Sequence, residues 1–416
     1  MASSDNQAQG ASAQQTYRFK VTVGEKDLSN DIYMFNIVTS VQLPYQTFEV
    51  GFTLDQNDLS LEKIYGQEPI KISVILETEA ALEIQATDFE LIFLSVNNVL
   101  TSQVNSPADS DTQQVDRIKF SFMAISKKAY ATMNHYINDV FHAYNLSEIL
   151  TSIVEKTGAQ LILDFNGINT TTIKQILIPP STLYQTFSYL NQLFGLYDGV
   201  SAYFCSHDNK VNIKNLTKKI TSSDAFTIYQ LSLNSEEDVL KDSKPERTYI
   251  NWGNVQSSYK GNSVIAAITP TLRYILKPSD RLFHKTTIGI DEFTKKCGIV
   301  DKENQIFYDK TTLKIDKRMA TYISQTGNEL SEVFINSSLS KHISELATLN
   351  MTIIRNFYVL SFMNVGEAVN FVTQIDQNVS LSGKYILKSS LIEFSKISSW
   401  EAAASISLIR SNKTTN

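Results

Sequence analysis

The stretch IPPSTLYQTFSYLNQLFGLYDG, residues 178–199, has the most clearly marked ends in the chain. Pro179 and Pro180 exclude a preceding helix, and Ser181 or Thr182 can cap a new one. Apolar residues then recur at i, i+4, i+7 and i+11 until Gly195 ends the pattern. These residues are Leu183, Phe187, Leu190 and Phe194. The stretch therefore predicts a helix with one apolar stripe.

The polar face of this helix indicates what it packs against. It carries Gln185, Ser188, Asn191 and Gln192 but no lysine or arginine. Helices that lie on membrane surfaces are typically basic on their polar face. We therefore expect this helix to pack against protein.

A second helix is predicted in NLSEILTSIVEKTG, residues 145–158. Asn145 can cap its start, Glu148 can complete a capping box, and Gly158 can take the left-handed position after its end. Five residues fall on one apolar stripe: Leu146, Ile149, Leu150, Ile153 and Val154. Apolar residues keep helical spacing from about 127 to 195, interrupted by a short strand in AQLILDF.

The regions on either side favour β-structure. Apolar residues alternate around 17–23, 48–54, 70–76, 88–94 and 117–124, and the polar stretch 105–116 suits a hairpin tip. A hairpin around the HDNK turn at 207–210 follows the helices, and strands recur in TLNMTII, AVNFVTQ, KYILKSSLIEF and ASISLIR near the C-terminus. In 224–315 short strand candidates such as RTYINWG and SVIAAIT lie among connectors rich in Lys, Asp and Ser.

These elements predict a β-rich α+β protein with two small antiparallel β-barrel domains and a helical or mixed α+β insertion between them. Residues 1–16 are expected to be a disordered leader and 17–126 the first β-barrel domain. Residues 127–223 form the helical or mixed domain and 224–315 an irregular β connecting region. Residues 316–416 form the second β-barrel domain, with a helix expected within 318–347.

Composition is that of an ordinary globular chain. The 416 residues are 42% hydrophobic and 19% charged, enough for two to four domains with cores of their own. The net charge of −6, without a dense basic block, argues against duplex nucleic acid as a ligand. Two distant cysteines, Cys205 and Cys297, predict free thiols in a reducing compartment. No signal peptide or membrane-spanning segment is recognised.

The sequence offers no catalytic, cofactor-binding or metal-ligating residues. Phosphate-binding glycine loops, the G-x-S-x-G elbow and the H-E-x-x-H zinc pair are all absent. His135 and His142 could share a helix face, and Cys205 and His207 one side of a strand, but neither pair supplies the three or four ligands that zinc needs. The carboxylates at 236–238 suit a solvated segment, and Trp252 and Trp400 are isolated aromatics. Catalysis and cofactors are therefore not expected.

The order of these elements resembles the baseplate or tail hub proteins of contractile-tailed bacteriophages, which are related to the N-terminal part of VgrG spikes. The motifs that carry the resemblance are LSEILTSIVEKTG, ILIPPSTLYQTFSYLNQLFGLYDG and the late GKYIL strand leading to SLIRSN. The resemblance covers most of the chain from about residue 17.

The resemblance implies a homotrimeric ring in the virion baseplate, made in the host cytoplasm, that joins the tail tube to the central spike. Two β domains per subunit would present six similar units to a six-fold tube. The implied partners are the spike protein and the tube or a distal tube-initiating protein, with the tape measure and baseplate wedge proteins further candidates. The chain stops at SNKTTN, so the spike is expected to be a separate polypeptide.

Three alternatives remain open at this stage. One is a hub from a phage-derived injection machine of type VI or bacteriocin type. Another is an envelope-degrading hydrolase, which would need a carboxylate pair or nucleophile in a pocket. The last is a carbohydrate-binding tail protein, which would need exposed aromatic side chains on loops.

Overall fold

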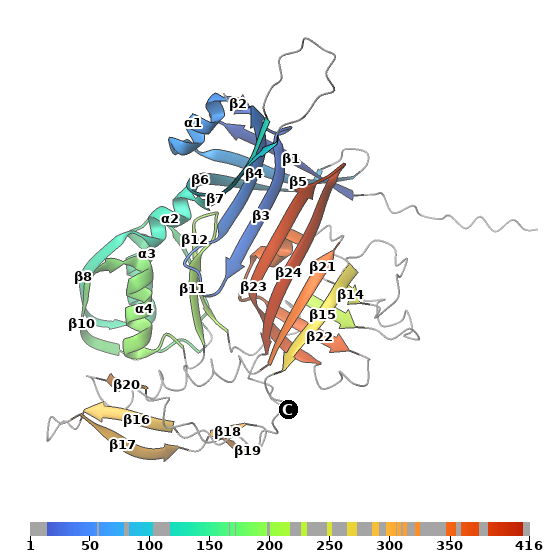
Figure 1. Cartoon of the computed structure of the whole chain (residues 1–416). Coiled ribbons are helices and arrows are strands. Elements are labelled where there is room, and N and C mark those ends of the chain that lie inside the picture. The colour runs from blue at the N-terminus through green and yellow to red at the C-terminus, as the bar shows by residue number, and fades with distance from the viewer. Residues whose placement is uncertain are drawn as a thin grey trace, which may run out of the picture.

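The computed structural model describes residues 15–55, 58–78, 83–102, 117–165, 167–170, 172–197, 200–216, 226–230, 248–251, 264–272, 285–290, 297–304, 306–308, 311–313, 321–324, 347–354, 359–373 and 382–410. This part of the chain consists mainly of β-strands with four α-helices, which confirms the predicted β-rich α+β class. Figure 1 shows two groups of long strands side by side, and the helices α2–α4 with their own strands on one flank.

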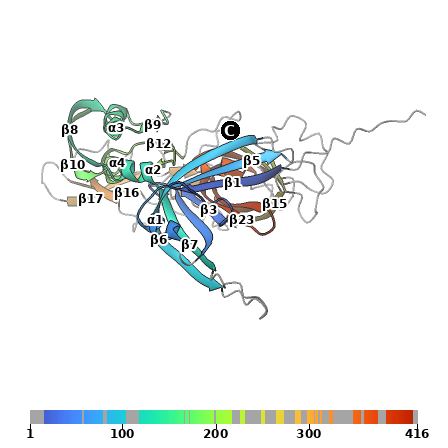
Figure 2. The ribbon, with the colours of Figure 1, turned by 90° about the horizontal axis from the view of Figure 1, so that it is seen from above.

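The first sheet is antiparallel throughout. Its strands are β1 (Gln15–Val23), β2 (Lys26–Asp27), β3 (Ile32–Ser40), β4 (Thr47–Asp55), β5 (Ile70–Thr78), β6 (Glu83–Ser102) and β7 (Arg117–Ser126). They lie in the order β2-β1-β5-β6-β7-β4-β3. In β1 the alternation has the expected effect, because Tyr17, Phe19, Val21 and Val23 are buried while the residues between them are not. Seen from above, β6 and β7 extend together beyond the body of the sheet (Figure 2).

Three elements of this region were not predicted: the two-residue strand β2, strand β3 and helix α1. Strand β3 alternates less cleanly than its neighbours, with Phe35, Asn36 and Ile37 buried in succession. Helix α1 (Leu59–Tyr65) is short, and Asp58 caps it by accepting a hydrogen bond of 2.8 Å from the Ser60 N–H. The 105–116 stretch lies outside the described residues, but the strands it connects are paired from Ser102 and Arg117 onward.

The middle part combines three helices with two small sheets. Its elements are α2 (Lys127–Met133), β8 (Tyr136–Asn145), α3 (Leu146–Glu155), β9 (Gln160–Leu163), β10 (Thr172–Thr182), α4 (Leu183–Phe194), β11 (Ser201–Cys205) and β12 (Lys210–Asn215). Strands β8 and β10 pair with each other, and β11-β12-β9 form the second sheet. The prediction of helical spacing throughout 127–195 is wrong for β8 and β10, whose backbones satisfy each other's hydrogen bonds.

Both predicted helices begin as expected. Asn145 and Glu148 form a capping box on α3, and Thr182, rather than Ser181, forms one with Gln185 on α4. Gly158 and Gly195 follow the two helices with positive φ angles of 71° and 70°. The prolines of the opening stretch lie within β10, where the pairing shifts register between Ile178 and Ser181. Proline is tolerated there because it interrupts no regular ladder.

The C-terminal strands predicted from the sequence are confirmed, and the sheet they form is mixed. It contains β13 (Phe226–Gln230), β14 (Thr248–Asn251), β15 (Val264–Leu272), β21 (Ala347–Ile354), β22 (Ala368–Thr373), β23 (Gly383–Lys396) and β24 (Trp400–Arg410). The pairing order runs β23-β22-β13-β14-β15-β21-β24 and returns to β23. Strand β13 pairs in parallel with β14 and β22, and β14 with β15. The prediction of an antiparallel C-terminal barrel is therefore wrong for the pairing of β22 with β13, while β13–β15 lie in the region predicted to be irregular. Parallel neighbours need long crossover connections, which short turn signals cannot reveal.

In the described part of the chain, the two groups of strands are parts of one continuous 14-stranded sheet, joined at β3 and β23, and they share one apolar core. Strand β23 pairs through its first residues with β22 and through Ser389–Ser395 with β3. Buried residues from both sheets, including Phe19 and Phe394, belong to a single cluster, and the middle part has a cluster of its own. The prediction of two separate barrels is therefore not established by the structure, and the proposed domain boundaries remain predictions.

The rest of the predicted connecting region is described only in short pieces. Strands β16 (Lys285–Ile290), β17 (Cys297–Asn304) and β20 (Thr321–Ser324) form one small sheet, and β18 (Ile306–Tyr308) pairs with β19 (Thr311–Leu313). Of the helix expected within 318–347, the described residues Thr321–Ser324 form a strand, and the remainder lies outside the described part.

Candidate assembly surface

A two-stranded ribbon formed by β8 and β10 presents an apolar outer side. Ile137, Ile176 and Ile178 are buried on its inner side, against the cluster that contains α3 and α4. On the outer side Val140 is paired directly with Leu177. Their exposed fractions are 50% and 57%, and Tyr136 on the same side is 73% exposed. The ribbon therefore exposes side chains that globular proteins usually bury.

Local sequence fixes the ribbon on the helices. Strand β10 passes directly into α4, and the first helical N–H, that of Leu183, donates to the carbonyl of His135 at 2.8 Å. The Tyr189 hydroxyl of α4 donates to the Leu177 carbonyl at 3.4 Å. At the other end Asn145 both ends β8 and caps α3, so ribbon and helices are held by one continuous set of bonds.

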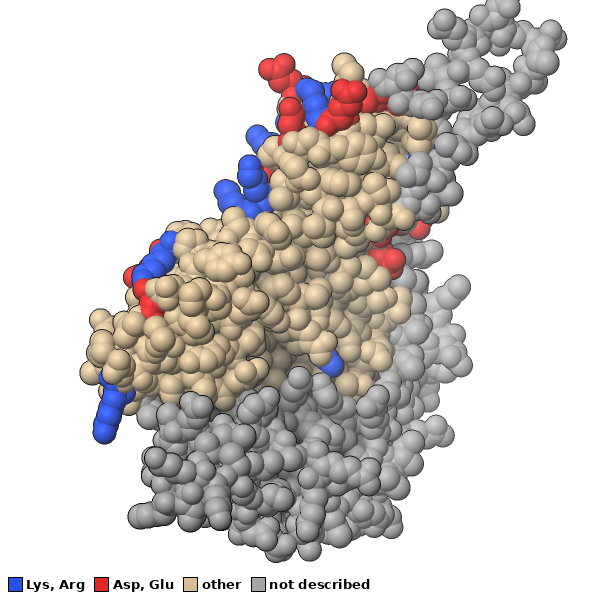
Figure 3. Space-filling model, turned by 60° about the vertical axis from the view of Figure 1, so that its left-hand side comes forward, with Lys and Arg blue, Asp and Glu red and all other residues tan. Residues whose placement is uncertain are grey.

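The ribbon itself carries few charges, Asp139 on β8 and Lys174 on β10. Figure 3, turned so that the flank carrying β8 and β10 in Figure 1 comes forward, shows a broad face whose centre is uncharged, with acidic and basic side chains toward its edges. The inner side of β8 has one charged residue, Asp139, which forms an ion pair of 2.6 Å with Lys156. An uncharged face with exposed apolar side chains is typical of protein interaction surfaces.

A polar junction ties the middle part to both sheets. The Gln46 side chain, in the connection between β3 and β4, is buried. Its Nε2 donates to the Met363 carbonyl at 3.2 Å, and its Oε1 accepts from the His207 N–H at 3.0 Å. Met363 belongs to the short 3-10 helix η4 (Val359–Met363). One amide thus connects the first sheet, the β11–β12 turn and the C-terminal sheet.

His207 is held neutral at this junction. Its Nδ1 lies 3.1 Å from Gln46 Oε1, and its ring lies 4.7 Å from that of Phe89. Burial lowers the pKa of the imidazole below its ordinary value, with a smaller opposing effect from Asp208. The site therefore uses the histidine as a neutral hydrogen-bonding group.

The residues considered for chemistry do not meet in one site. His135 precedes β8 and His142 lies on the strand, so the expected common helix face is wrong. Cys205 is buried at the end of β11, where burial raises the pKa of the thiol to about 12. His207 follows in the confirmed HDNK turn, where Asn209 has a positive φ of 63°. No group of three metal-ligating side chains occurs among the described residues.

The remaining candidates are divided between described and undescribed residues. The carboxylates at 236–238, Trp252 and the pairing state of Cys297 lie outside the side chains that the structure describes. Trp400 begins β24 and packs on Phe19 of β1, with ring centroids 4.0 Å apart. It is therefore part of an aromatic cluster rather than isolated as expected. No helix of the described part is long and apolar enough to cross a membrane.

Sequence reasoning missed the outer side of the ribbon because it assigned residues 136–145 to a helical region. The sequence did contain a pattern that indicates a strand with two apolar faces. The segment YINDVFHAYN has apolar residues at both parities, Tyr136 and Val140 on one and Ile137 and Phe141 on the other. A strand that is apolar on both faces is either buried on both or covered by another molecule.

The sheets and the helical flank together define the fold of phage tail proteins. Over 95% of its length the chain is similar to the tail protein from Neisseria meningitidis MC58, with a TM-score of 0.55, 12% identity and 97% of that chain covered. The chain is also similar to the 43 kDa tail protein of prophage MuSo2 from Shewanella oneidensis, with a TM-score of 0.51 and 12% identity. This match covers 95% of this chain and 99% of that chain. The predicted resemblance to tail proteins is thus confirmed for the fold.

The fold is also similar to that of a chain in a complex from Francisella. A chain of the Francisella PdpA–VgrG complex has a TM-score of 0.50 at 13% identity, and the match covers 97% of this chain and 53% of that chain. At the level of sequence, residues 70–256 match the family model described as Bacteriophage PBS1 gene 109 protein. This match includes α3, α4 and the ribbon. The sequences of curated proteins give no match.

Proposed function

We propose that the chain is a non-enzymatic structural subunit of a phage baseplate hub, which forms a trimeric ring between the tail tube and the central spike. The observation that carries this proposal is the likeness to two tail proteins, which spans 95% of this chain and nearly the whole of each of theirs. A likeness of this extent argues that the whole chain, rather than one grafted module, serves the tail.

The ribbon supplies a surface for subunit contact. Its outer side exposes Tyr136, Val140 and Leu177 on two paired strands that carry only two charged residues. Covering such side chains would remove apolar area from water without a conformational change, which favours a stable contact between preformed subunits.

The sheet topology fits a ring built from barrel-like units. The C-terminal strands pair in an order that returns to its start, and β23 joins them to the first sheet. We infer that each β part acts as one barrel, so that a trimer presents six to the tail tube. The spike, a distal tube-initiating protein, the tape measure and wedge proteins are the partners this arrangement proposes, in the baseplate of the virion.

The mass of the purified chain tests the proposal. The monomer has a mass of 46.8 kDa, and light scattering after size exclusion should give about three times this value, with rings in electron micrographs. A chain that stays monomeric at high concentration, alone and with its spike protein, would contradict it.

A double variant tests the ribbon. Val140→Lys with Leu177→Lys should convert the trimer to a folded monomer, because buried unpaired ammonium groups oppose association. Leu59→Lys is the matched control, since Leu59 is also an exposed leucine, at 68%, but lies on α1. Trimers that persist in the double variant would exclude the ribbon from the subunit contact.

A hub of a phage-derived injection machine is the second candidate. It is favoured by the likeness to a chain of the PdpA–VgrG complex. Particles purified with antibodies against the chain distinguish the two: filled capsids on the tails indicate a phage, and tails without capsids indicate the machine.

A further inference from the structure

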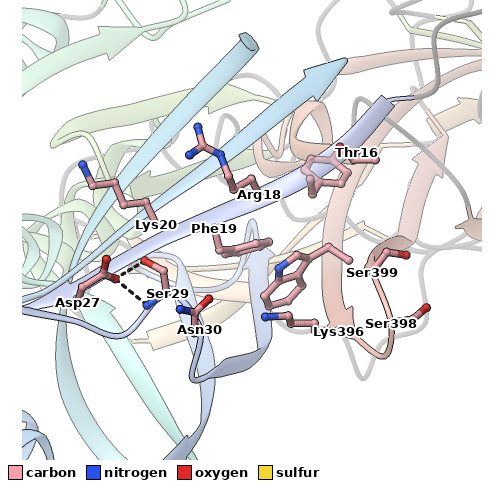
Figure 4. Close-up of a pocket in the computed structure, with 12 residues that line it drawn as sticks. Thr16, Arg18, Phe19, Lys20, Asp27, Ser29, Asn30, Lys396, Ser398 and Ser399 are labelled. Atoms are coloured by element: carbon pink, nitrogen blue, oxygen red, sulfur yellow. Dashed lines mark hydrogen bonds between the residues drawn. The ribbon is translucent and has the colours of Figure 1, made fainter. Parts of the chain in front are cut away.

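A cleft of about 550 Å³ lies between strand β1 and the tip of the β23–β24 hairpin. Figure 4 shows its lining, with Lys20, Asp27, Ser29 and Asn30 toward one end and Lys396, Ser398 and Ser399 toward the other. The two walls come from segments more than 350 residues apart in the sequence. Neither the assembly proposal nor the sequence patterns make use of this cleft.

Within the described part of the chain, no strand pairs with residues 16–20 on the edge of β1 that borders the cleft. Strand β1 pairs with β5 along one edge, and on the other only Thr22 and Val23 pair with β2. On that second edge the Val21 N–H donates to Ser29 Oγ at 2.9 Å, and its carbonyl accepts from the Leu28 N–H at 2.8 Å. Alternate residues of a strand direct their main-chain groups to the same edge, so those of Phe19 also face the cleft.

The floor of the cleft is aromatic and rigid. Phe19 packs against Trp400 and, with centroids 5.3 Å apart, against Phe394. Tyr17 contacts Phe394 at 5.0 Å. Main-chain groups next to a packed aromatic floor are preorganised, since they need no rearrangement to accept a strand.

The rim of the cleft is basic. Arg18 is engaged by Glu77 at 2.7 Å, and Asp27 accepts hydrogen bonds from Ser29. Lys20 and Lys396 are both exposed and have no ion-pair partner in the described part of the chain. A lysine on an edge strand, such as Lys20, can also serve to prevent aggregation. That explanation does not apply to Lys396, which lies on the opposite wall of the cleft, 6.0 Å from the centroid of the Trp400 ring. Asp27 also lines the cleft, and the hydrogen bonds from Ser29, with a smaller contribution from the nearby Lys20 charge, lower the pKa of its carboxyl. Arg18, Lys20 and Lys396 still outnumber Glu77 and Asp27, so the rim keeps a net positive charge that complements carboxylates.

We propose that this cleft binds an extended, acidic segment of another protein, which adds a strand to the free edge of β1. Main-chain hydrogen bonds to Phe19 supply affinity, and carboxylates at the two ends of the segment pair with Lys20 and Lys396. Five residues, from Thr16 to Lys20, cover about 13 Å of edge at ~3.3 Å per residue. The occupant therefore needs about five to seven extended residues. This inference does not depend on the number of subunits in the proposed ring.

Trp400 can report binding in the full-length protein. The chain has two tryptophans, so Trp252→Phe leaves Trp400 as the single fluorophore. The probe is the peptide acetyl-Thr-Asp-Thr-Val-Thr-Asp-Thr-amide, whose two aspartates lie on one face four residues apart. We expect saturable binding with a dissociation constant below about 1 mM, which corresponds to roughly −4 kcal/mol.

Charge and backbone controls separate strand addition from other contacts. The double variant Lys20→Glu with Lys396→Glu should bind the acidic peptide at least tenfold more weakly than the wild type does. The same variant should bind a peptide with lysines in place of the two aspartates, because the charges are then complementary again. The peptide is also methylated on alternate backbone nitrogens, in two complementary versions. One version should lose binding and the other retain it, because only one set of N–H groups faces β1.

Three results would overturn the proposal. The first is no binding of the acidic peptide at about 1 mM by a protein whose circular dichroism shows it folded. The second is equal binding of both methylated peptides, which excludes main-chain pairing. The third is a Trp400 response to chitooligosaccharides but not to the peptide, which would assign the cleft to carbohydrate. Light scattering on the same samples gives the mass of the assembly. It therefore shows separately whether the proposed trimeric ring forms.

Discussion

Phe187 is the residue on which the apolar stripe of α4 can be tested most directly. It is fully buried, and its ring contacts that of Tyr203 with centroids 5.7 Å apart. Phe187→Asp would place a carboxylate without a partner in this cluster, which we expect to cost several kcal/mol, roughly 3–5. Urea unfolding measures the loss. Gln192→Asp, on the exposed side of the same helix, should cost only about 0.5 kcal/mol, and an equal loss in both variants would contradict the assignment.

His207 should make stability depend on pH near neutrality. Its folded-state pKa is lowered by burial, so the unfolded chain binds the proton more readily. The stabilising effect is therefore complete above pH 6.5 and is lost as the pH falls through the folded-state pKa. The free energy of unfolding should be measured between about pH 5.5 and 7.5, because this pH window lies above the range in which most carboxylates titrate.

The variant His207→Gln gives the comparison. It keeps a side-chain donor for Gln46 but removes the titrating group. Its unfolding free energy should change less with pH than that of the wild type across this window. Parallel curves for the two proteins would show that another group causes the dependence.

At the scale of elements, the cap of α3 carries a defined part of the stability. Asn145 Oδ1 accepts from the Glu148 N–H at 2.9 Å, and Glu148 Oε2 accepts from the Asn145 N–H at 2.8 Å. Asn145→Ala removes half of this box and should cost about 1 kcal/mol in urea unfolding. Asn145→Asp preserves an acceptor and should stay within about 0.5 kcal/mol of the wild type. An alanine variant as stable as the aspartate variant would refute the role of the cap.

The elements that the sequence predicts well are those whose signals are local. The ends of α3 and α4 are set by residues within one turn, Asn145 with Glu148 and Thr182 with Gln185. Strand β8 was missed because its partner β10 begins 27 residues after β8 ends, and no local rule states that pairing. The parallel pairs of β13 were missed for the same reason.

The candidate surfaces depend even more on distant contacts. The ribbon became visible only once Val140 and Leu177 were placed on one face. The cleft lies between β1 and the tip of the β23–β24 hairpin, next to Trp400, and neither wall alone indicates a binding site. Lys20 and Lys396 have meaning as a pair only in the folded chain.

At the scale of the whole molecule, Gln46 is the point where the three parts meet. Its buried amide bonds Met363 of η4 and His207 of the β11–β12 turn while its own backbone lies beside β4. Gln46→Ala leaves the Met363 carbonyl and the His207 N–H without this partner. The Met363 carbonyl keeps the Val365 N–H as a donor at 3.2 Å, so the cost of about 1–3 kcal/mol comes mainly from the unpaired His207 N–H. The position of the loss matters more than its size, because this one amide bonds a carbonyl of η4 and an N–H of the β11–β12 turn at the same time.

We therefore expect Gln46→Ala to reduce the cooperativity of unfolding as well as its free energy. If the junction couples the middle part to the sheets, near-ultraviolet and far-ultraviolet circular dichroism should follow one transition in the wild type and separate ones in the variant. Gln42→Ala, in the same connection but with an exposed side chain, is the control and should keep a single transition. A single, merely shifted transition in Gln46→Ala would mean that the shared β core and the Cys205–Pro44 main-chain bond of 2.8 Å couple the parts without the amide.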